Sequence, residues 1–147
     1  MKKILIILVI GVFIYDWTSD VYYSSDSSKY DSISIKNSDS VLQNAFKNGL
    51  YDLQVEGLGT VIKLLPDDNI GSRHQKFIIK LSSGQTLLIS HNIDLAPSIN
   101  DLSYGDQVEF NGEYEWNSKG GLIHWTHRDP KGYHADGWLK HNGKIYQ

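Results

Sequence analysis

The sequence predicts an all-β fold: a small five-stranded Greek-key barrel of the OB type with a C-terminal hairpin extension, preceded by an N-terminal signal or anchor segment. Apolar and polar residues alternate along five short segments between residues 53 and 126. The longest connection lies between the third and fourth segments, and the first segment contains two glycines that allow a strand to coil. Because periodicity does not separate barrel types, a lipocalin-like or SH3-like barrel is the competing architecture.

Length and composition limit the chain to one domain with an appendage. It has 147 residues, of which 40% are hydrophobic and 21% charged, and two large domains would need a longer chain. The chain has no cysteine, which excludes disulfides, thiolate metal sites and cysteine nucleophiles, so a metal would need histidine and carboxylate ligands. A net charge of -3 argues against a strongly basic nucleic-acid coat protein.

The N-terminus has the layout of an export signal. Lys2 and Lys3 precede an apolar run over 4–15, which is shorter than the roughly 20 residues that span a bilayer. No small-x-small cleavage site follows the run, so residues 1–23 are predicted to be either a cleaved signal peptide or an uncleaved anchor. We therefore expect an exported protein, periplasmic or anchored in the inner membrane and facing the periplasm.

Residues 24–40 are rich in Ser, Asp, Lys and Asn, which predicts a polar flexible tether. A short helix is expected next, capped by Ser40 and ended by Gly49. Spacing of i, i+3 and i+4 gives this helix an apolar face made of Leu42, Ala45 and Phe46. The β-barrel domain with its leading helix is thus predicted over 41–147.

The first expected strand, 53–64, shifts the phase of its apolar positions across Gly57 and Gly59, which indicates a bulged and strongly coiled strand. The long connection after the third strand, 92–104, has room for one helical turn. A tight turn at Asn142-Gly143 predicts the C-terminal hairpin. The remaining expected strands are 77–81, 86–90, 108–116 and 122–126.

Histidines are dense near the C-terminus, where four of six follow residue 120. One hypothesis is a site for a divalent metal such as zinc, or an acid/base site, built from His124, His127 and His134. Asp129 or Asp136 would be the fourth ligand or a supporting residue. The alternative is that these imidazoles make only structural hydrogen bonds.

Side chains alternate along an extended strand, so His124 and His127 converge only if the chain turns after Trp125 or Thr126. We expect His127, at the strand end, to be the functional residue of the pair. His124, inside the strand, is expected to be structural.

Other catalytic patterns are weaker. No G-x-S-x-G sequence is present for a serine nucleophile. Glu113 and Glu115 could form a carboxylate pair, but alternating glutamates on a half-exposed strand are typical of a solvated face. We therefore interpret both as surface residues, and Trp116, which continues the apolar face of the same strand, as a core residue.

Aromatic and basic residues are interleaved in the last third of the chain. Aromatic planes with cations suit single-stranded nucleic acid, and the same planes with histidines and carboxylates suit an oligosaccharide. We expect a monomeric, envelope-located binding module for such a ligand; the alternatives are a metal-dependent hydrolase (phosphodiesterase or nuclease) and a structural envelope interaction protein. The candidate ligand-binding residues are His91, His124, Trp125, His127, Arg128, Asp129, His134 and Trp138.

Four stretches of the chain resemble a bacterial domain family of unknown function that is marked by an HWTH sequence. They read LLPDDNIGSRHQKFI, LLISHNIDLAP, GDQVEFNGEYEWN and GGLIHWTHRDPKGYHADGWLKHNGKIY. The resemblance covers about 55–146. It implies an export or membrane segment before the domain, and it implies no particular activity.

Overall fold

A computed structural model describes residues 27–147, so the expected signal or anchor segment over 1–23 lies outside the described residues. No helix in this described part is both long enough and apolar enough to cross a membrane. The elements are α1 (Ser27–Asn48), β1 (Leu53–Leu64), β2 (His74–Lys80), β3 (Thr86–Asn92), β4 (Gln107–Glu115), β5 (Leu122–His124), β6 (Trp138–His141) and β7 (Lys144–Tyr146).

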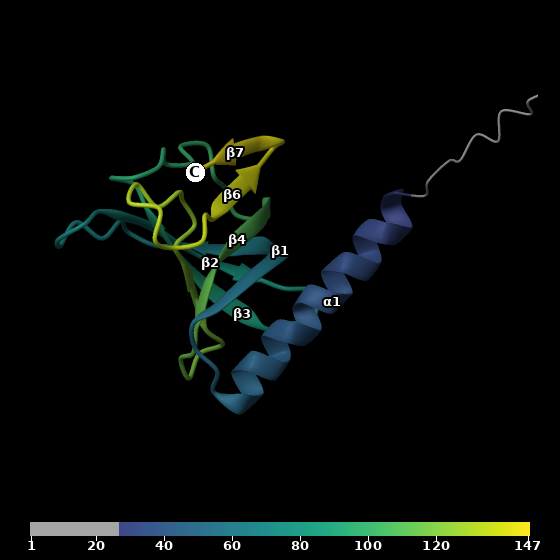
Figure 1. Cartoon of the computed structure of the whole chain (residues 1–147). Helices are drawn as coiled ribbons and strands as arrows, with labels where there is room; N and C mark the ends of the chain where they lie inside the picture. Colours follow the sequence, from purple (N-terminus) through teal and green to yellow (C-terminus); the bar gives the residue numbers. More distant parts are fainter. Residues whose placement is uncertain (1–26) are drawn as a thin grey trace, which may run out of the picture.

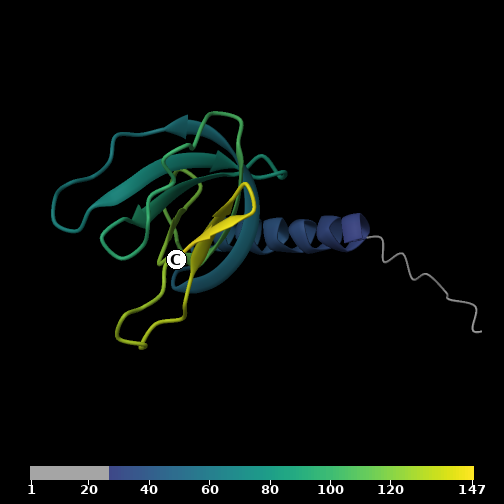
Figure 2. The ribbon, with the colours of Figure 1, turned by 90° about the horizontal axis from the view of Figure 1, so that it is seen from above.

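Five strands close into a barrel in the order β1-β2-β3-β5-β4, because β1 also pairs with β4 (Figures 1 and 2). Strand β1 is long enough to pair with β4 through its first part and with β2 through its last part. Strands β3 and β5 are parallel, and the other barrel pairs are antiparallel. This is the strand order of an OB-type Greek-key barrel, and the predicted fold class is confirmed.

The two glycines of β1 make room for the core. A Cβ atom on Gly57 would lie 2.5 Å from the Phe110 ring, and one on Gly59 would be almost as close to another core side chain. Both glycines stay on the inward-facing positions of β1, so the predicted change of phase across them is wrong. The register instead shifts between Val61 and Lys63, within the part of β1 that pairs with β2; the change of partner from β4 to β2 occurs earlier, at Thr60.

The barrel interior is filled with side chains, and both ends of the barrel are covered. Buried Leu42 and Ala45 of α1 close one end. The connection between β3 and β4 closes the other end with Ala96, Ile99 and Leu102. It contains the one helical turn for which it has room, since the Ala96 amide donates to the Asn92 carbonyl at 3.1 Å. Functional groups are therefore to be sought on the outer wall and in the loops.

Helix α1 begins at least thirteen residues earlier than predicted, so the expected flexible tether over 24–40 is wrong for residues 27–40. Ser40 lies inside the helix, where its hydroxyl donates to the carbonyls of Lys36 and Asn37 rather than capping the N-terminus. The predicted end is confirmed: Gly49 has a φ of 64°, and the following amide bonds back to the helix.

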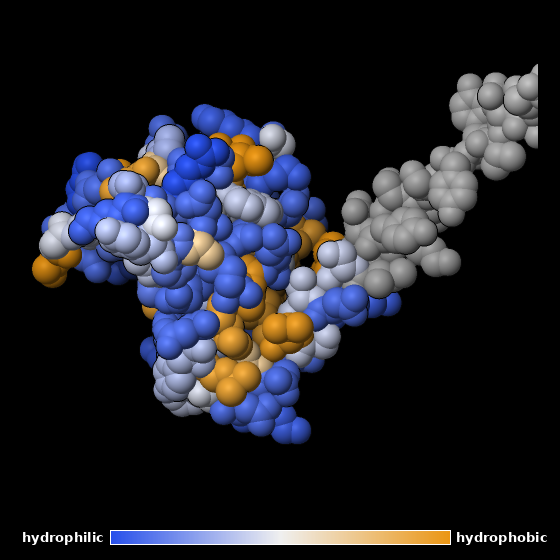
Figure 3. All heavy atoms as spheres, in the orientation of Figure 1, coloured by the Kyte–Doolittle hydropathy of each residue, from blue (hydrophilic) through white to orange (hydrophobic). Residues whose placement is uncertain are grey.

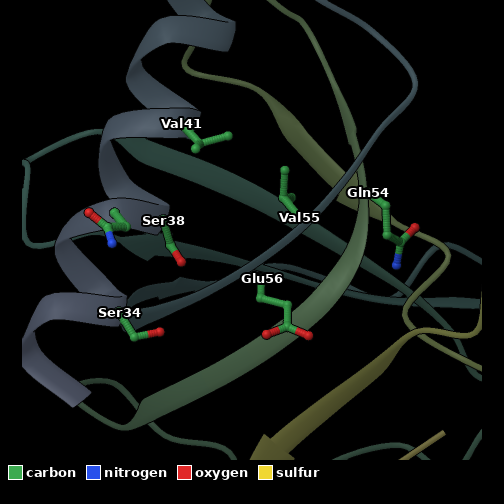
Figure 4. Close-up of a pocket in the computed structure, with 7 residues that line it drawn as sticks. Ser34, Ser38, Val41, Gln54, Val55 and Glu56 are labelled. Atoms are coloured by element: carbon green, nitrogen blue, oxygen red, sulfur yellow. The ribbon is translucent and has the colours of Figure 1, made fainter. Parts of the chain in front are cut away.

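The C-terminal half of α1 docks on the barrel, and its N-terminal half runs away from the barrel (Figure 1). Hydrophobic side chains on the viewed face gather where helix and barrel meet (Figure 3). Between them lies a cavity of about 470 Å³ (Figure 4). One face of α1 and the start of β1 line it with Ser34, Asn37, Ser38, Val41, Gln54, Val55 and Glu56.

Strands β6 and β7 form the predicted C-terminal hairpin. Asn142 and Gly143 both have positive φ, at 48° and 77°, as a two-residue type I′ turn requires. Strand β6 pairs with β4 and so extends the sheet beyond the closed barrel.

Candidate functional site

Strands β4 and β5 bring a carboxylate and an imidazole together on the outer wall. Their register places Glu113 directly opposite His124. The His124 Nε2 atom lies 3.0 Å from Glu113 Oε1 and 3.8 Å from Glu115 Oε1. Gly112 and Tyr114 alternate with the two glutamates along β4 and face the core. Both glutamates therefore point outward.

The chain reverses immediately after β5. Trp125 adopts a left-handed conformation with φ of 51°, and the loop that follows returns to the wall at Gly137. The Gly137 amide donates to the His127 carbonyl at 2.9 Å. A Cβ atom on Gly137 would lie 1.9 Å from the Trp125 carbonyl oxygen, so only glycine permits this closure.

Asp129 holds this loop together rather than facing a ligand. Its carboxylate accepts hydrogen bonds from the backbone amides of Lys131, Tyr133 and His134. The bond from the Lys131 amide is the main reason why the pKa of Asp129 is lowered, with the His134 amide next. Asp129 therefore acts by positioning His134.

His134 is the second imidazole on Glu113. Its Nε2 atom lies 2.5 Å from Glu113 Oε2, and its Nδ1 atom donates to the Ala135 carbonyl at 2.7 Å. The ring stacks on Trp125 with centroids 4.1 Å apart and planes 6° apart. Partial burial disfavours the charged ring, but the Glu113 carboxylate and the Ala135 carbonyl outweigh it, so the pKa of His134 is raised.

Four side chains thus form one carboxylate–imidazole cluster: Glu113, Glu115, His124 and His134. Ligand atoms of the first three lie within 4.8 Å of one another. Atoms bound tetrahedrally to one zinc ion are about 3.3 Å apart, so separations of 3.0 and 3.8 Å straddle that value. The pKa of Glu115 is raised, mainly by burial and secondly by the neighbouring Asp52.

The cluster is accessible from solvent. Its side chains retain exposed fractions of 17% for Glu113, 26% for Glu115, 33% for His124 and 21% for His134. A half-open set of donors can bind an ion and still leave coordination positions to an external molecule.

His127 lies apart from the cluster. The residue is 4% exposed, its Nδ1 atom donates to the Arg128 carbonyl at 2.8 Å, and its ring contacts Trp125 with centroids 5.2 Å apart. The predicted three-histidine set is therefore not formed, since only His124 and His134 meet at one carboxylate. His127, expected to be the functional residue of the pair, is buried, and His124, expected to be structural, is partly exposed and contacts Glu113.

His91 is a buried hydrogen-bonding residue. Its Nε2 atom donates to the Pro97 carbonyl at 3.0 Å, and its Nδ1 atom accepts from the Thr126 hydroxyl at 2.8 Å. Burial lowers the pKa of His91 to about 4, so the ring is neutral at physiological pH. With no exposed surface, His91 cannot line a binding surface on the wall.

The remaining predicted residues are spread out. Arg128 is exposed on the loop, and Asp136 accepts from the Asp129 amide. Trp138 lines a separate cavity of about 300 Å³ beside α1. Trp116, interpreted as a core residue, is partly buried and donates from Nε1 to the Phe46 carbonyl, so it fastens α1 to the barrel.

Sequence reasoning missed Glu113 and Glu115 as site residues. Their two-residue spacing was visible, but it is equally typical of a solvated strand face. The additional signal is that the next strand carries an outward-facing histidine. This histidine can be paired with a glutamate only when the β4–β5 register is known, and the turn between these strands sets that register.

The family model described as "Protein of unknown function (DUF3465)" matches residues 26–147. A search of curated proteins found no match. The matched region spans nearly all of α1, the whole barrel and the C-terminal hairpin. The chain belongs to the DUF3465 family of proteins of unknown function.

Proposed function

We propose that this protein binds a divalent transition metal ion, zinc in the first place, at the carboxylate–imidazole cluster. One observation carries the proposal. Ligand atoms of Glu113, Glu115 and His124 lie within 4.8 Å of one another, and His124 Nε2 is 3.0 Å from Glu113 Oε1 and 3.8 Å from Glu115 Oε1. Two carboxylates and an imidazole at these separations suit one ion with donor atoms about 3.3 Å apart, and the shorter hydrogen bond from His134 orients the Glu113 carboxylate.

The surrounding charges favour a cation over an anionic strand. Asp52 lies close enough to Glu115 to raise its pKa, and Glu113 adds a third carboxylate. Three carboxylates repel the phosphates of a nucleic acid. Because one face of Trp125 is occupied by His134, this ring is also a poor stacking surface for a base or a sugar. Nucleic acid and oligosaccharide, both considered for this face, are therefore less favoured here than a metal.

A metal-dependent hydrolase is the second candidate. It is favoured by the partial exposure of all four donors, since a catalytic metal keeps an open position for water or substrate. In such an enzyme, the residues of the cluster would hold the ion, and Asp129 would hold the loop that carries His134.

Isothermal titration calorimetry with zinc chloride tests the proposal on protein purified without a histidine tag. We expect one ion per chain, and we expect Glu113→Gln and His134→Ala each to weaken affinity by about tenfold or more. His74→Ala is the matched control, because His74 begins β2, its ring donates to the Ser72 carbonyl, and it has no contact with the cluster.

Two results would overturn the proposal. One is the absence of zinc binding by the parent protein. The other is equal binding by the parent and by both cluster variants, which would place the ion elsewhere. Hydrolysis of a phosphodiester substrate that requires zinc and is lost in Glu113→Gln would establish the second candidate.

A further inference from the structure

A second surface, independent of the proposed metal site, lies on strands β2 and β3 beside the β4–β5 turn. Two cavities of about 450 and 540 Å³ adjoin there, since both are lined by Thr86 and Lys119. We call this surface the lysine groove. One cavity is lined by Lys63, Leu65, Ile78, Thr86, Leu87, Leu88, Asn117, Lys119 and Gly121, and the other adds Gln43, Phe46, Lys47, Gly84, Gln85 and Gly120.

Every charged residue that lines the groove is a lysine. Lys47, Lys63 and Lys119 are exposed, and no acidic residue lines either cavity. Among residues 27–147, none of the three lysines pairs with a carboxylate; the paired lysines are Lys76 and Lys140. In a chain of net charge -3, this is a local concentration of unneutralised positive charge.

The floor of the groove is aliphatic. Ile78 and Leu88 are direct cross-strand partners on the outer face of β2 and β3, and both are only partly buried. Leu65 adds a third apolar side chain at the end of β1. An aliphatic floor lined also by cations is complementary to a ligand that combines apolar faces with an anionic backbone.

We infer that the lysine groove binds single-stranded nucleic acid. The three lysines contact successive phosphates, and the unpaired bases lie against the aliphatic floor. The continuity of the two cavities fits an extended strand rather than a single compact anion. A duplex would bury its bases in the stack and leave the floor uncovered, so the groove prefers a single strand.

Fluorescence anisotropy with a labelled single-stranded oligothymidylate tests the inference. EDTA is present throughout, so that a metal at the cluster cannot bridge protein and phosphate. We expect saturable binding whose logarithmic salt dependence has a slope of about -2, as three released counterions give for a single strand. This readout does not depend on whether the proposed metal site exists.

Charge-matched variants locate the binding surface. The triple variant Lys47→Gln, Lys63→Gln, Lys119→Gln should bind at least tenfold more weakly and lose most of the salt slope. The control triple variant Lys131→Gln, Lys140→Gln, Lys144→Gln has the same net charge and should bind like the parent. Thermal unfolding of both variants confirms that they are folded. The inference would be overturned if both triple variants lost binding to the same extent, or if neither variant lost binding.

Base contacts separate nucleic acid from polyanions in general. An abasic oligomer of the same length should bind several-fold more weakly than oligothymidylate, because it cannot cover the floor. Leu88→Ser should remove that difference. If the abasic oligomer or dextran sulfate binds as tightly as oligothymidylate, the groove is a general polyanion surface and the inference is wrong.

Discussion

The ring nitrogens of three histidines show how local bonds decide the role of each imidazole. His91, His127 and His134 each donate from one nitrogen to a backbone carbonyl. The partner of the second ring nitrogen differs between His91 and His134. In His91 it accepts from buried Thr126, whereas in His134 it faces the Glu113 carboxylate. His134 is thereby placed to hold and orient the Glu113 carboxylate.

The raised pKa of His134 predicts a pH-dependent contribution to stability. The folded pKa lies above the unfolded value, so the charged His134–Glu113 pair stabilises the fold fully below about pH 6.5, and this stabilisation is lost as pH rises through the folded pKa. For this partly exposed pair, His134→Gln should lower the free energy of unfolding by on the order of 1 kcal/mol in mild acid, and by less at alkaline pH.

Urea unfolding at a series of pH values measures this difference, with His74→Gln as the control for loss of a histidine outside the cluster. The same proton competes with the metal, so zinc affinity should rise with pH over the range in which His134 titrates. A stability difference that grows toward alkaline pH would contradict the assigned ion pair.

Sequence reasoning at this scale found the right turn but not the right partners. A histidine-rich reversal after β5 could be predicted, because His124 and His127 require a turn to converge. The turn instead buries His127 and brings His134 from nine residues beyond Trp125. The deciding contact, Glu113 with two imidazoles, depends on a pairing register and a loop closure that no local pattern encodes.

Among the elements, α1 shows most clearly where local pattern stops being sufficient. Its polar N-terminal half has the composition of a tether, yet it is helical. Asp39 accepts hydrogen bonds from Ser82 and from the Ser83 amide, across 43 and 44 residues of sequence. This docking, together with buried Leu42, fixes the C-terminal half of α1, and extending a helix from a fixed turn costs little per residue.

Shortening the chain tests how much of α1 the barrel needs. A protein that begins at Ser38 retains Asp39, Leu42 and the Trp116 bond to Phe46. We expect it to unfold cooperatively and to lose no more than about 1 kcal/mol, since the removed turns run away from the barrel. Asp39→Ala in the shortened protein should cost a further 1 to 3 kcal/mol, roughly, because two donors lose their acceptor.

Chemical denaturation followed by circular dichroism reports both changes. Failure of the shortened protein to fold would show that the N-terminal half of α1 is part of the core structure. An unchanged free energy of unfolding in Asp39→Ala would show that the contact with the β2–β3 turn does not hold the helix.

In the molecule as a whole, a filled barrel displays its chemistry on the outer wall. Leu122 of β5 pairs with Leu88 of the lysine groove on one side and with Glu115 of the cluster on the other. Strands are about 4.8 Å apart, so the two surfaces are separated by roughly 10 Å of wall. The wall therefore carries the carboxylate–imidazole cluster and the lysine groove on neighbouring strands.

The barrel could be predicted because its information is local: alternation along each strand, glycines and turn residues between strands, and one long connection. The hairpin followed from Asn142-Gly143 in the same way. The surfaces could not be predicted to the same degree, since they are formed by residues on strands that are neighbours only after closure. Lys47, Lys63 and Lys119 come from three distant elements.

Export is the prediction made for the first 23 residues. Fused to a reporter that is active only outside the cytoplasm, they should deliver it across the membrane, because two lysines precede an apolar run as in a signal sequence. Substituting Ile6 and Leu8 with Lys should abolish export, while substituting Thr18 and Ser19, which follow the apolar run, with Lys should not. Reporter activity confined to the cytoplasm would contradict the prediction.

The carboxylate–imidazole cluster is proposed to bind one divalent metal ion through Glu113, Glu115 and His124. Anomalous diffraction at the zinc absorption edge, from crystals of the tag-free protein grown with equimolar zinc, tests it most directly. The proposal predicts one strong peak within about 2.2 Å of the Glu113, Glu115 and His124 donor atoms. A peak only at other residues, or direct contact between His134 and Glu113 with no peak in the cluster, would contradict it.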